Sequence, residues 1–476
     1  MPDDGPAWTS APTSLRHLPV VVIGAGPVGL AAAAHLLARG LNPLVLEAGT
    51  EIAASVRAWG HVRMFSPWRY NIDPAARALL EADGWREPDP ESYPTGAELV
   101  VRYLAPLARV PALARAIRTN ARVVGVTKAG HDLMRDGNRD DAAFVVQVAD
   151  HKGDVTEREA AAVIDCSGTW TSPNPAGANG LPAPGERAAA ERIAYGIPDV
   201  AGTERAAYAG RTTLVIGGGH SAMNAVLDLA SLAAAAPDTR ILWAFRNPLA
   251  AINFGGGAAD GLAERGALGA RARQLAETGV VTTLAPFLTA RIEHTGDGRL
   301  AITARDGQVV MADRIIVAAG FRPDLSMLSE LRLQLDPAVQ STPALAPLID
   351  PNLHSCGTVR PHGEAELRHP ERRVWIAGMK SYGRAPTFLL ATGHEQVRSI
   401  AAALAGDWVA AREVHLDLPE TGVCSTDRVN EGASACCAPA VAPAACCAPQ
   451  PVAATSCCGA KAEVAVAAPA KTACCG

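Results

Sequence analysis

Two glycine-rich segments, far apart in the chain, have the residue types and spacing that bind phosphate groups. Glycines there permit a tight turn, and they let backbone N–H groups approach a pyrophosphate at the N-terminus of the following helix. The first segment is Gly24-Ala25-Gly26-Pro27-Val28-Gly29, and the second is Gly217-Gly218-Gly219-His220-Ser221-Ala222. One such match is weak, because similar loops occur as plain turns. Two of them, each in a suitable context, predict two dinucleotide sites.

The residues that end the next strand distinguish the two dinucleotides. Glu47 lies 23 residues after Gly24 and is followed by Ala48, and an acid there binds the two ribose hydroxyls of an adenosine. After the second loop the same place holds Arg246 and Asn247, with no acid. A carboxylate would repel a 2′-phosphate, whereas an arginine pairs with it. We therefore predict NADPH rather than NADH at the second loop; the alternative is that Arg246 is only a surface cation.

Most of the eleven cysteines lie near the end of the chain, where they form adjacent pairs. A disulfide between neighbours closes a strained ring, so adjacent thiols stay available. Several thiolates on one mobile segment suit a soft ion such as As(III), Hg(II), Cu(I) or Zn(II). The alternative is an alanine-rich extension that binds nothing. The predicted metal ligands are Cys436, Cys437, Cys446, Cys447, Cys457, Cys458, Cys474 and Cys475.

The remaining cysteines, Cys166, Cys356 and Cys424, are too few and too scattered to form a disulfide scaffold. Cys166 ends an apolar run, and we expect an inert residue at the end of a strand.

Each glycine-rich loop is embedded in a strand, turn, helix and strand pattern. Around the first loop we expect a strand at 19–23, a helix at 30–39 and a strand at 44–46; around the second, a strand at 211–216, a helix at 223–232 and a strand at 241–245. This is the unit of dinucleotide-binding folds. The fold class is therefore α/β, with two Rossmann-like domains.

Further strand-to-glycine patterns at 161–168, 314–320 and 374–378 indicate that the second domain is inserted into the first. The first domain is predicted to comprise 18–170 and 321–416, the crossing segment 171–207, the second domain 208–320 and a terminal tail 417–476. The tail consists largely of Ala, Pro, Val and Cys and is expected to stay flexible, because it cannot bury enough surface to offset its ordering entropy.

Composition excludes several classes of partner. The formal net charge of -5 is small for 476 residues, so no polyanion-binding surface is expected and nucleic acid is an unsuitable partner. The first residues lack the apolar core of a signal peptide, and no run of about 20 apolar residues could span a bilayer. We expect a cytoplasmic protein without a membrane partner.

Taken together, these motifs resemble the two-dinucleotide-binding-domain flavoproteins, and among them the flavin-containing monooxygenases, over residues 18–410. Segment 57–67 is similar to the stretch of that group that lies along the flavin, and 166–170 and 319–323 resemble its two domain-crossing turns. Segment 378–388 is most similar to the flavin monooxygenases encoded with arsenic-resistance genes. The resemblance implies FAD at the first loop, bound by Gly24, Ala25, Gly26, Pro27, Gly29, Glu47, Ala48, Trp59, Met64, Gly168 and Gly378, and NADPH at the second, bound by Gly217, Gly219, His220, Ser221, Ala222, Arg246 and Asn247.

Two signatures of related enzymes are missing. The monooxygenase pattern Phe-x-Gly-x-x-x-His-x-x-x-Trp/Tyr is absent between residues 171 and 210, and the Cys-x-x-Cys of thioredoxin reductases is absent too. We name no catalytic side chain, because the flavin performs the chemistry in such enzymes.

Three functions remain open from the sequence. The leading hypothesis is an NADPH- and FAD-dependent monooxygenase that uses O2 on a soft centre such as trivalent arsenic. The second is a flavin-dependent reductase of a thiol-bound metal or metalloid. The third is a metalloid-sequestering flavoprotein. The expected partners are a small-molecule or metalloid substrate and O2, and a homodimer is one open oligomeric state.

Overall fold

The computed structural model describes residues 12–249, 254–255, 257, 260–353, 359–386 and 388–416. The described residues form two parallel sheets, and a separate three-stranded antiparallel sheet packs against each of them. Among the described residues, no helix is both long enough and apolar enough to cross a membrane.

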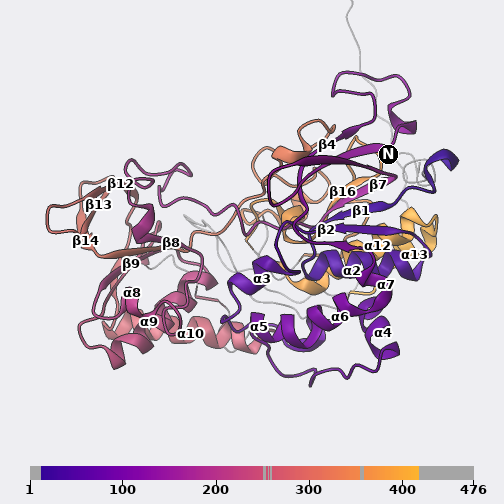
Figure 1. Cartoon of the computed structure of the whole chain (residues 1–476). Helices are drawn as coiled ribbons and strands as arrows, with labels where there is room; N and C mark the ends of the chain where they lie inside the picture. Colours follow the sequence, from indigo (N-terminus) through magenta and orange to yellow (C-terminus); the bar gives the residue numbers. More distant parts are fainter. Residues whose placement is uncertain are drawn as a thin grey trace, which may run out of the picture. The chain divides into compact units, whose positions relative to one another are not determined.

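The first parallel sheet has the order β16-β7-β1-β2-β3 (Figure 1). Its strands are β1 (Val20–Ile23), β2 (Pro43–Leu46), β3 (Ile117–Arg118), β7 (Ala162–Asp165) and β16 (Val374–Ile376). The β-branched residues of β1 are all buried, because helices cover one face of the sheet and another sheet covers the other.

Helices α2 (Pro27–Ala38), α4 (Pro74–Ala82) and α12 (Leu390–Leu404) pack together in the core on one face of this sheet. Helix α2 is buried over most of its length, which explains its composition of alanine and leucine with almost no polar side. The antiparallel sheet of β4 (Arg122–Lys128), β5 (Phe144–Ala149) and β6 (Val155–Ala160) shares the core on the other face.

The second parallel sheet has the order β11-β10-β9-β15-β8. Its strands are β8 (Ile193–Tyr195), β9 (Thr212–Ile216), β10 (Arg240–Ala244), β11 (Thr282–Leu284) and β15 (Arg314–Val317). Helices α9 (His220–Ala235) and α10 (Ala263–Thr278) pack against each other beside it. The antiparallel strands are β12 (Thr289–His294), β13 (Leu300–Ala304) and β14 (Val309–Ala312).

Short helices and turns connect these elements. They are η1 (Thr13–Leu15), α3 (Ala54–Ala58), η2 (Trp68–Tyr70), α5 (Gly96–Leu99), the π-helical turn η3 (Val100–Leu104), α6 (Ala105–Arg109), α7 (Pro111–Ala114), η4 (Arg139–Asp141), η5 (Ala190–Arg192), α8 (Arg205–Tyr208), η8 (Ser326–Leu328), α11 (Ala346–Ile349), η9 (Gly378–Tyr382) and α13 (Trp408–Arg412).

The predicted α/β fold with an inserted second domain is confirmed, since β16 returns to the first sheet after the whole second sheet has formed. Two details differ from the expectation. Strand β8 pairs with β15, so the second sheet already takes a strand from the stretch predicted as a crossing segment. Both loop helices begin earlier than predicted, at Pro27 and His220, because the glycine before each is an extended N-cap and the loop itself provides the first helical turn.

Candidate functional site

The glycines of the first loop have two different structural roles. Gly24 has a φ of +98°, and a Cβ there would lie 2.9 Å from the carbonyl oxygen of Cys166. A Cβ on Gly29 would lie 1.9 Å from the carbonyl oxygen of Gly24. These two glycines are required by the close approach of the helix to the strand ends. A Cβ on Gly26 would meet nothing within 4 Å, so this position borders open space at the N-terminus of α2. The space suits a pyrophosphate.

Glu47 lies beside this loop, directly after β2. Its Oε2 accepts a hydrogen bond from the Ala25 N–H and its Oε1 accepts one from the Gly49 N–H, both at 2.8 Å. Each carboxylate oxygen can accept a second hydrogen bond. Glu47 therefore braces the loop and retains acceptor capacity for ribose hydroxyls, as an FAD site requires.

The second loop repeats this arrangement. Gly217 has a φ of +136°, and its Cβ would lie 2.3 Å from the carbonyl oxygen of Ala318. Gly219 is the extended N-cap of α9, and a Cβ there would meet nothing within 4 Å. Ala222 is fully buried against the sheet, in the place that Gly29 has in the first loop. Arg246 is exposed two residues after β10 ends. The residues present thus fit a second dinucleotide.

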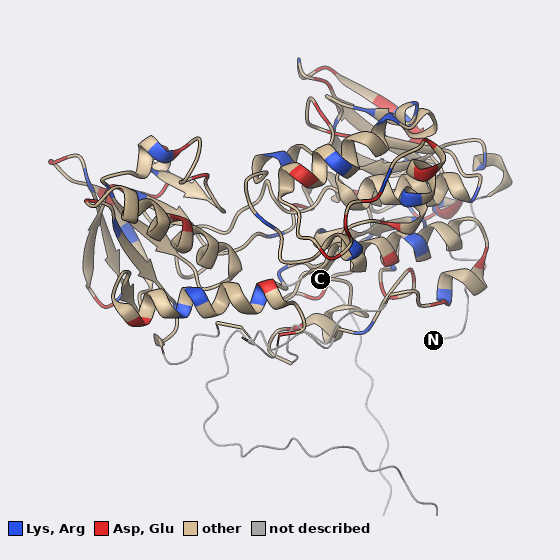
Figure 2. Cartoon of the chain, turned by 90° about the horizontal axis from the view of Figure 1, so that it is seen from below, with Lys and Arg blue, Asp and Glu red and all other residues tan. Residues whose placement is uncertain are grey.

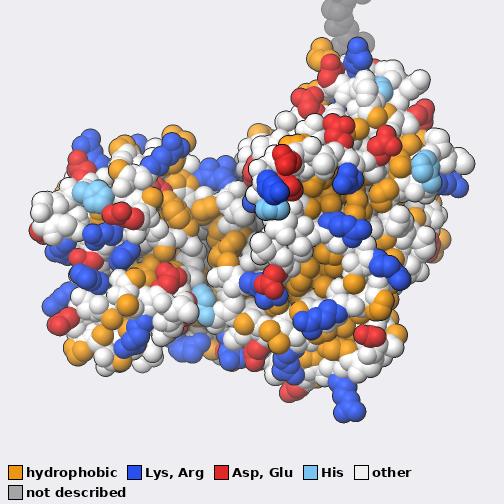
Figure 3. Space-filling model, in the orientation of Figure 1, with side chains coloured by type: hydrophobic (Ala, Val, Ile, Leu, Met, Phe, Trp, Pro, Cys, Tyr) orange, Lys and Arg blue, Asp and Glu red, His pale blue; other side chains and the backbone are white. Residues whose placement is uncertain are grey.

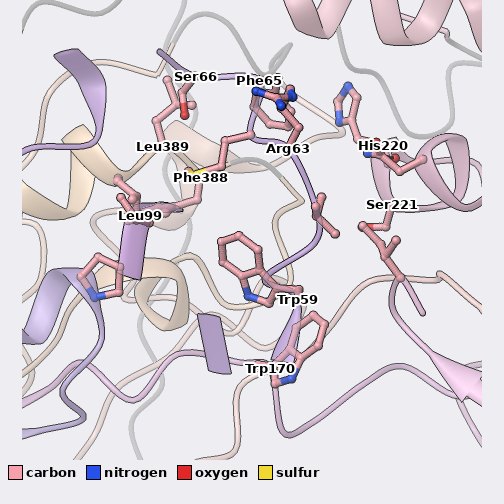
Figure 4. A pocket seen from close by; sticks show the side chains of 16 residues that line it. Trp59, Arg63, Phe65, Ser66, Leu99, Trp170, His220, Ser221, Phe388 and Leu389 are labelled. Carbon is pink, nitrogen blue, oxygen red and sulfur yellow. Dashed lines mark hydrogen bonds between the residues drawn. The ribbon is translucent and has the colours of Figure 1, made fainter. Parts of the chain in front are cut away.

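A cavity of about 280 Å³ joins residues from both loops (Figure 4). Five predicted cofactor residues line it: Pro27, Trp59, Met64, His220 and Ser221. Gly168 and Gly378 do not line it; a Cβ on Gly378 would instead press on the Val28 side chain at 3.3 Å. The assignment of individual cofactor contacts stays a prediction.

Most of the cavity wall was not anticipated from the sequence. The additional lining residues are Val62, Arg63, Phe65, Ser66, Leu99, Trp170, Ile197, Asn224, Phe388, Leu389 and Leu390. Several of them lie in or next to segments 57–67 and 378–388, whose similarity to flavin monooxygenases could have indicated these residues from the sequence. Leu99 and Ile197 had none, because only the tertiary fold brings them to the cavity.

His220 is the first residue of α9, and its ring lies against that of Phe65, with the centroids 5.4 Å apart. Burial lowers the pKa of His220, and the nearby Arg265 charge lowers it further. The imidazole is therefore neutral at physiological pH. Figure 4 shows His220 and Ser221 on one side of the cavity and Leu99, Phe388 and Leu389 on the other.

A buried ion pair lies at the strand ends of the first sheet. The Lys380 Nζ is 2.7 Å from Asp165 Oδ2 and donates to Ser167 Oγ at 3.1 Å. The Ser167 hydroxyl in turn donates to Asp165 Oδ1 at 2.6 Å. This network ties η9 to the end of β7. Neighbouring Cys166 is a buried free thiol, and burial raises its pKa, which agrees with the inert role expected for it.

The two crossing segments are joined to each other. The Trp170 and Phe321 rings stack with centroids 5.0 Å apart. The Asn174 amide donates to the Ala319 carbonyl at 2.9 Å, and Arg322 Nε donates to Asn174 Oδ1 at 2.9 Å. The ring stacking and these hydrogen bonds therefore hold the two crossing segments together, and they fix Trp170 in the cavity wall.

The predicted metal ligands all lie outside the described residues. Within the described ranges of the chain, no group of three or more His, Cys, Asp or Glu side chains could hold a metal ion.

Gly96 fixes the position of Trp59 in the cavity wall. A Cβ there would lie 2.7 Å from Trp59 Cε3 and Cζ3. Gly96→Ala is expected to displace the indole, to lower the free energy of unfolding by about 1–3 kcal/mol, as overpacking does, and to quench or shift the flavin fluorescence. Gly296→Ala is the control, since its Cβ would meet nothing within 4 Å. Equal urea midpoints and spectra for the two variants would contradict this account.

Comparisons with known proteins agree with this geometry. The model of the pyridine nucleotide-disulphide oxidoreductase family matches residues 21–236, which include both glycine-rich loops. A search of curated proteins found no match. Among solved structures, the chain is similar to bacillithiol disulfide reductase from Bacillus cereus, with 20% identity, 83% of this chain and 99% of that chain covered, and a TM-score of 0.58.

Two hydroxylating or oxygenating enzymes are also similar. Flavin-containing monooxygenase from Stenotrophomonas maltophilia shares 22% identity, with 82% of this chain and 98% of that chain covered and a TM-score of 0.51. Ornithine hydroxylase from Pseudomonas aeruginosa shares 16% identity, with 83% and 100% covered and a TM-score of 0.52. At these identities the likeness establishes the fold.

The two loops, the two parallel sheets and the family match lead to one conclusion. The chain has the fold of the two-dinucleotide-binding-domain flavoproteins, and it is an oxidoreductase whose cofactors are FAD and NADPH.

Proposed function

We propose that the protein is an FAD- and NADPH-dependent monooxygenase that acts on a soft nucleophilic centre. The observation that carries this proposal is that one cavity is lined by Pro27 of the first loop and by His220 and Ser221 of the second. A flavin bound there would supply hydride acceptance from the nicotinamide and activation of O2.

The chain's own residues would position the rings and keep water out. Trp59, Leu99, Trp170 and Phe388 provide apolar wall. The N-termini of α2 and α9 both reach this cavity, through Pro27 and His220, so both helix dipoles would favour anionic groups of the cofactors there. The neutral His220 imidazole can orient a polar group by hydrogen bonding without adding a charge.

The second candidate is a disulfide or thiol-bound metalloid reductase, and the structural likeness to bacillithiol disulfide reductase favours it. Such a reaction requires a thiol or its ligand close to the flavin. In the stretches of the chain that the structure describes, the free cysteine is Cys166, and it does not line the cavity. A reductase would therefore need cysteines from outside the described residues.

Labelled oxygen separates the two candidates. With ¹⁸O2, NADPH and a thioether substrate, the monooxygenase proposal expects one labelled oxygen atom per product and one NADPH consumed per product. Complete NADPH oxidation coupled to thiol release under argon, with no label in any product under ¹⁸O2, would replace it by the reductase.

We further propose trivalent arsenic as the physiological soft centre and the paired cysteines as its capture segment. Each pair supplies two soft thiolates, and successive pairs are separated by spacers of 8, 9 and 15 residues. Several pairs can share one ion, because the cost of loop closure grows only logarithmically with length. All eight cysteines lie outside the described residues, so this proposal rests on the sequence.

Truncation after Gly432 tests the capture segment. We expect FAD content and substrate-free NADPH oxidation to stay unchanged, and As(III) or Hg(II) bound per chain to fall by more than half in equilibrium dialysis. Replacement of the eight cysteines by serine in the full chain is the matched control, and it should give the same loss. Undiminished ion binding by the truncated protein would refute the capture role.

Arg246 is expected to set the preference for NADPH. Arg246→Ala removes one charged contact with the 2′-phosphate, which is worth about 1–3 kcal/mol and corresponds to roughly a 5- to 150-fold rise in KM for NADPH. The KM for NADH should change little. Arg240→Ala, at the opposite end of β10, serves as the control. If the KM rises equally for both nucleotides, Arg246 does not contact the phosphate.

A further inference from the structure

The cavity carries an uncompensated positive charge. Of its lining residues, Arg63 alone has a permanently charged side chain, and no Asp or Glu is among them within the described residues. On the face that Figure 3 shows, basic and acidic side chains are interspersed, and the ribbon of Figure 2 shows both signs along the chain. No large patch of one sign is seen in these views, so we consider the charges of the cavity lining itself.

Arg63 is held in place by a short antiparallel contact. The Met64 N–H donates to the Pro94 carbonyl at 2.8 Å, and the Gly96 N–H donates to the Val62 carbonyl at 3.0 Å. These two backbone hydrogen bonds flank an isolated antiparallel β-bridge between Arg63 and Thr95. Thr95 begins α5 with a capping box, which makes the partner segment rigid.

The guanidinium of Arg63 uses only part of its hydrogen-bonding capacity within the protein. Its Nη1 donates to the Tyr93 carbonyl at 2.6 Å, and among the described residues it forms no ion pair. A guanidinium has five N–H donors in a planar fork that matches a carboxylate. Figure 4 shows Arg63 beside Phe65, at the region of the cavity between Phe388 and His220.

A helix end adds to this positive potential. Helix α12 begins at the cavity wall with Leu390 and has no side-chain N-cap, whereas the N-terminus of α9 would be taken up by the dinucleotide. The exposed N–H groups of a helix N-terminus carry about half a positive charge. No acidic group in the cavity lining offsets these contributions.

We propose that the substrate is a small apolar molecule whose soft atom, trivalent arsenic under the proposed function, lies at one end and whose single carboxylate, or a similar singly charged oxyanion, lies at the other, and that Arg63 binds this anionic end. This substrate class rests on the proposed monooxygenase function. The cofactor rings would occupy part of the cavity, and the apolar side chains on its Arg63 side, among them Phe65 and Phe388, would contact the body of the molecule, while the guanidinium supplies both affinity and orientation. The same anion chemistry could come from a phosphate of NADPH, which the experiment must separate.

The first arm of the experiment measures binding without turnover. The oxidised, FAD-loaded enzyme is titrated, in the absence of NADPH, with 4-(methylthio)benzoate and with the neutral thioanisole, followed by the flavin difference spectrum and by equilibrium dialysis. We expect the acid to bind more tightly than the neutral sulfide. Arg63→Gln should weaken binding of the acid roughly 10- to 100-fold, as the loss of a charge-assisted contact does, and leave thioanisole unchanged.

Two further variants make the result specific. Arg63→Lys keeps the charge and should recover some of the affinity for the acid. Arg86→Gln makes the same charge change at an exposed arginine outside the cavity lining and should have no effect. Wild-type enzyme that binds the two sulfides equally, or an Arg86→Gln loss as large as that of Arg63→Gln, would overturn the proposal.

The second arm separates the sources of the anion. If Arg63→Gln instead raises the KM for NADPH and leaves the preference for the acid intact, the anion is a cofactor phosphate and the substrate assignment is wrong. If neither sulfide incorporates ¹⁸O although the binding preference persists, the monooxygenase function fails while the anion site stands.

Discussion

Gly26→Val is expected to give a soluble, folded protein that retains less than about a tenth of the flavin of the wild type. Gly26 has φ -79° and ψ -173°, an extended conformation that suits valine, and a Cβ there meets nothing within 4 Å. The new side chain therefore fills only the space expected to hold the pyrophosphate. A loss of about 100-fold in FAD affinity corresponds to about 2.8 kcal/mol of binding free energy. Steric overlap between the valine side chain and the pyrophosphate is expected to cost about this much.

Gly29→Ala provides the contrasting variant in the same loop. Its Cβ would lie 1.9 Å from a backbone oxygen of Gly24, and backbone cannot move aside as a flexible side chain can. We expect loss of stability of about 3 kcal/mol or failure to fold, whether or not FAD is present. The two variants are distinguished by their absorbance at 450 nm per folded chain, with the folded fraction measured by circular dichroism. A yellow Gly26→Val protein with stoichiometric FAD would refute the assignment of the first loop.

Removal of Lys380 is expected to lower the free energy of unfolding by a large amount. Its ammonium and the Asp165 carboxylate are both almost fully buried, and Lys380→Met leaves that carboxylate with only the hydrogen bonds from Ser167. Breaking a buried pair by removing one partner costs about 3–5 kcal/mol, because the remaining charge is buried without compensation. Urea unfolding of the FAD-loaded protein measures this loss.

A double-mutant cycle makes this prediction specific to the ion pair. Asp165→Asn with Lys380→Met removes both charges and should cost less than the sum of the two single changes. Lys152→Met, at an exposed lysine, is the control, and its free energy of unfolding should lie within about 0.5 kcal/mol of that of the wild type. Strictly additive effects in the cycle would show that the two groups stabilise the fold independently.

The sequence by itself determined the two loops and the fold class, because these depend on local patterns. Gly24 and Gly217 need positive φ, the following helices need apolar residues at helical spacing, and Glu47 and Arg246 lie one strand beyond each loop. The predicted helix starts were three residues late, since the loop glycines serve as N-caps rather than as a separate turn.

Only the tertiary structure decided which side chains meet. Lys380 reaches Asp165 across 215 positions of sequence, and β8 joins the second sheet from inside the expected crossing segment. The cavity wall combines Arg63, Leu99, His220 and Phe388 from four separate segments. No local periodicity records such a meeting, because it depends on how strands and helices distant in the chain pack on a common core.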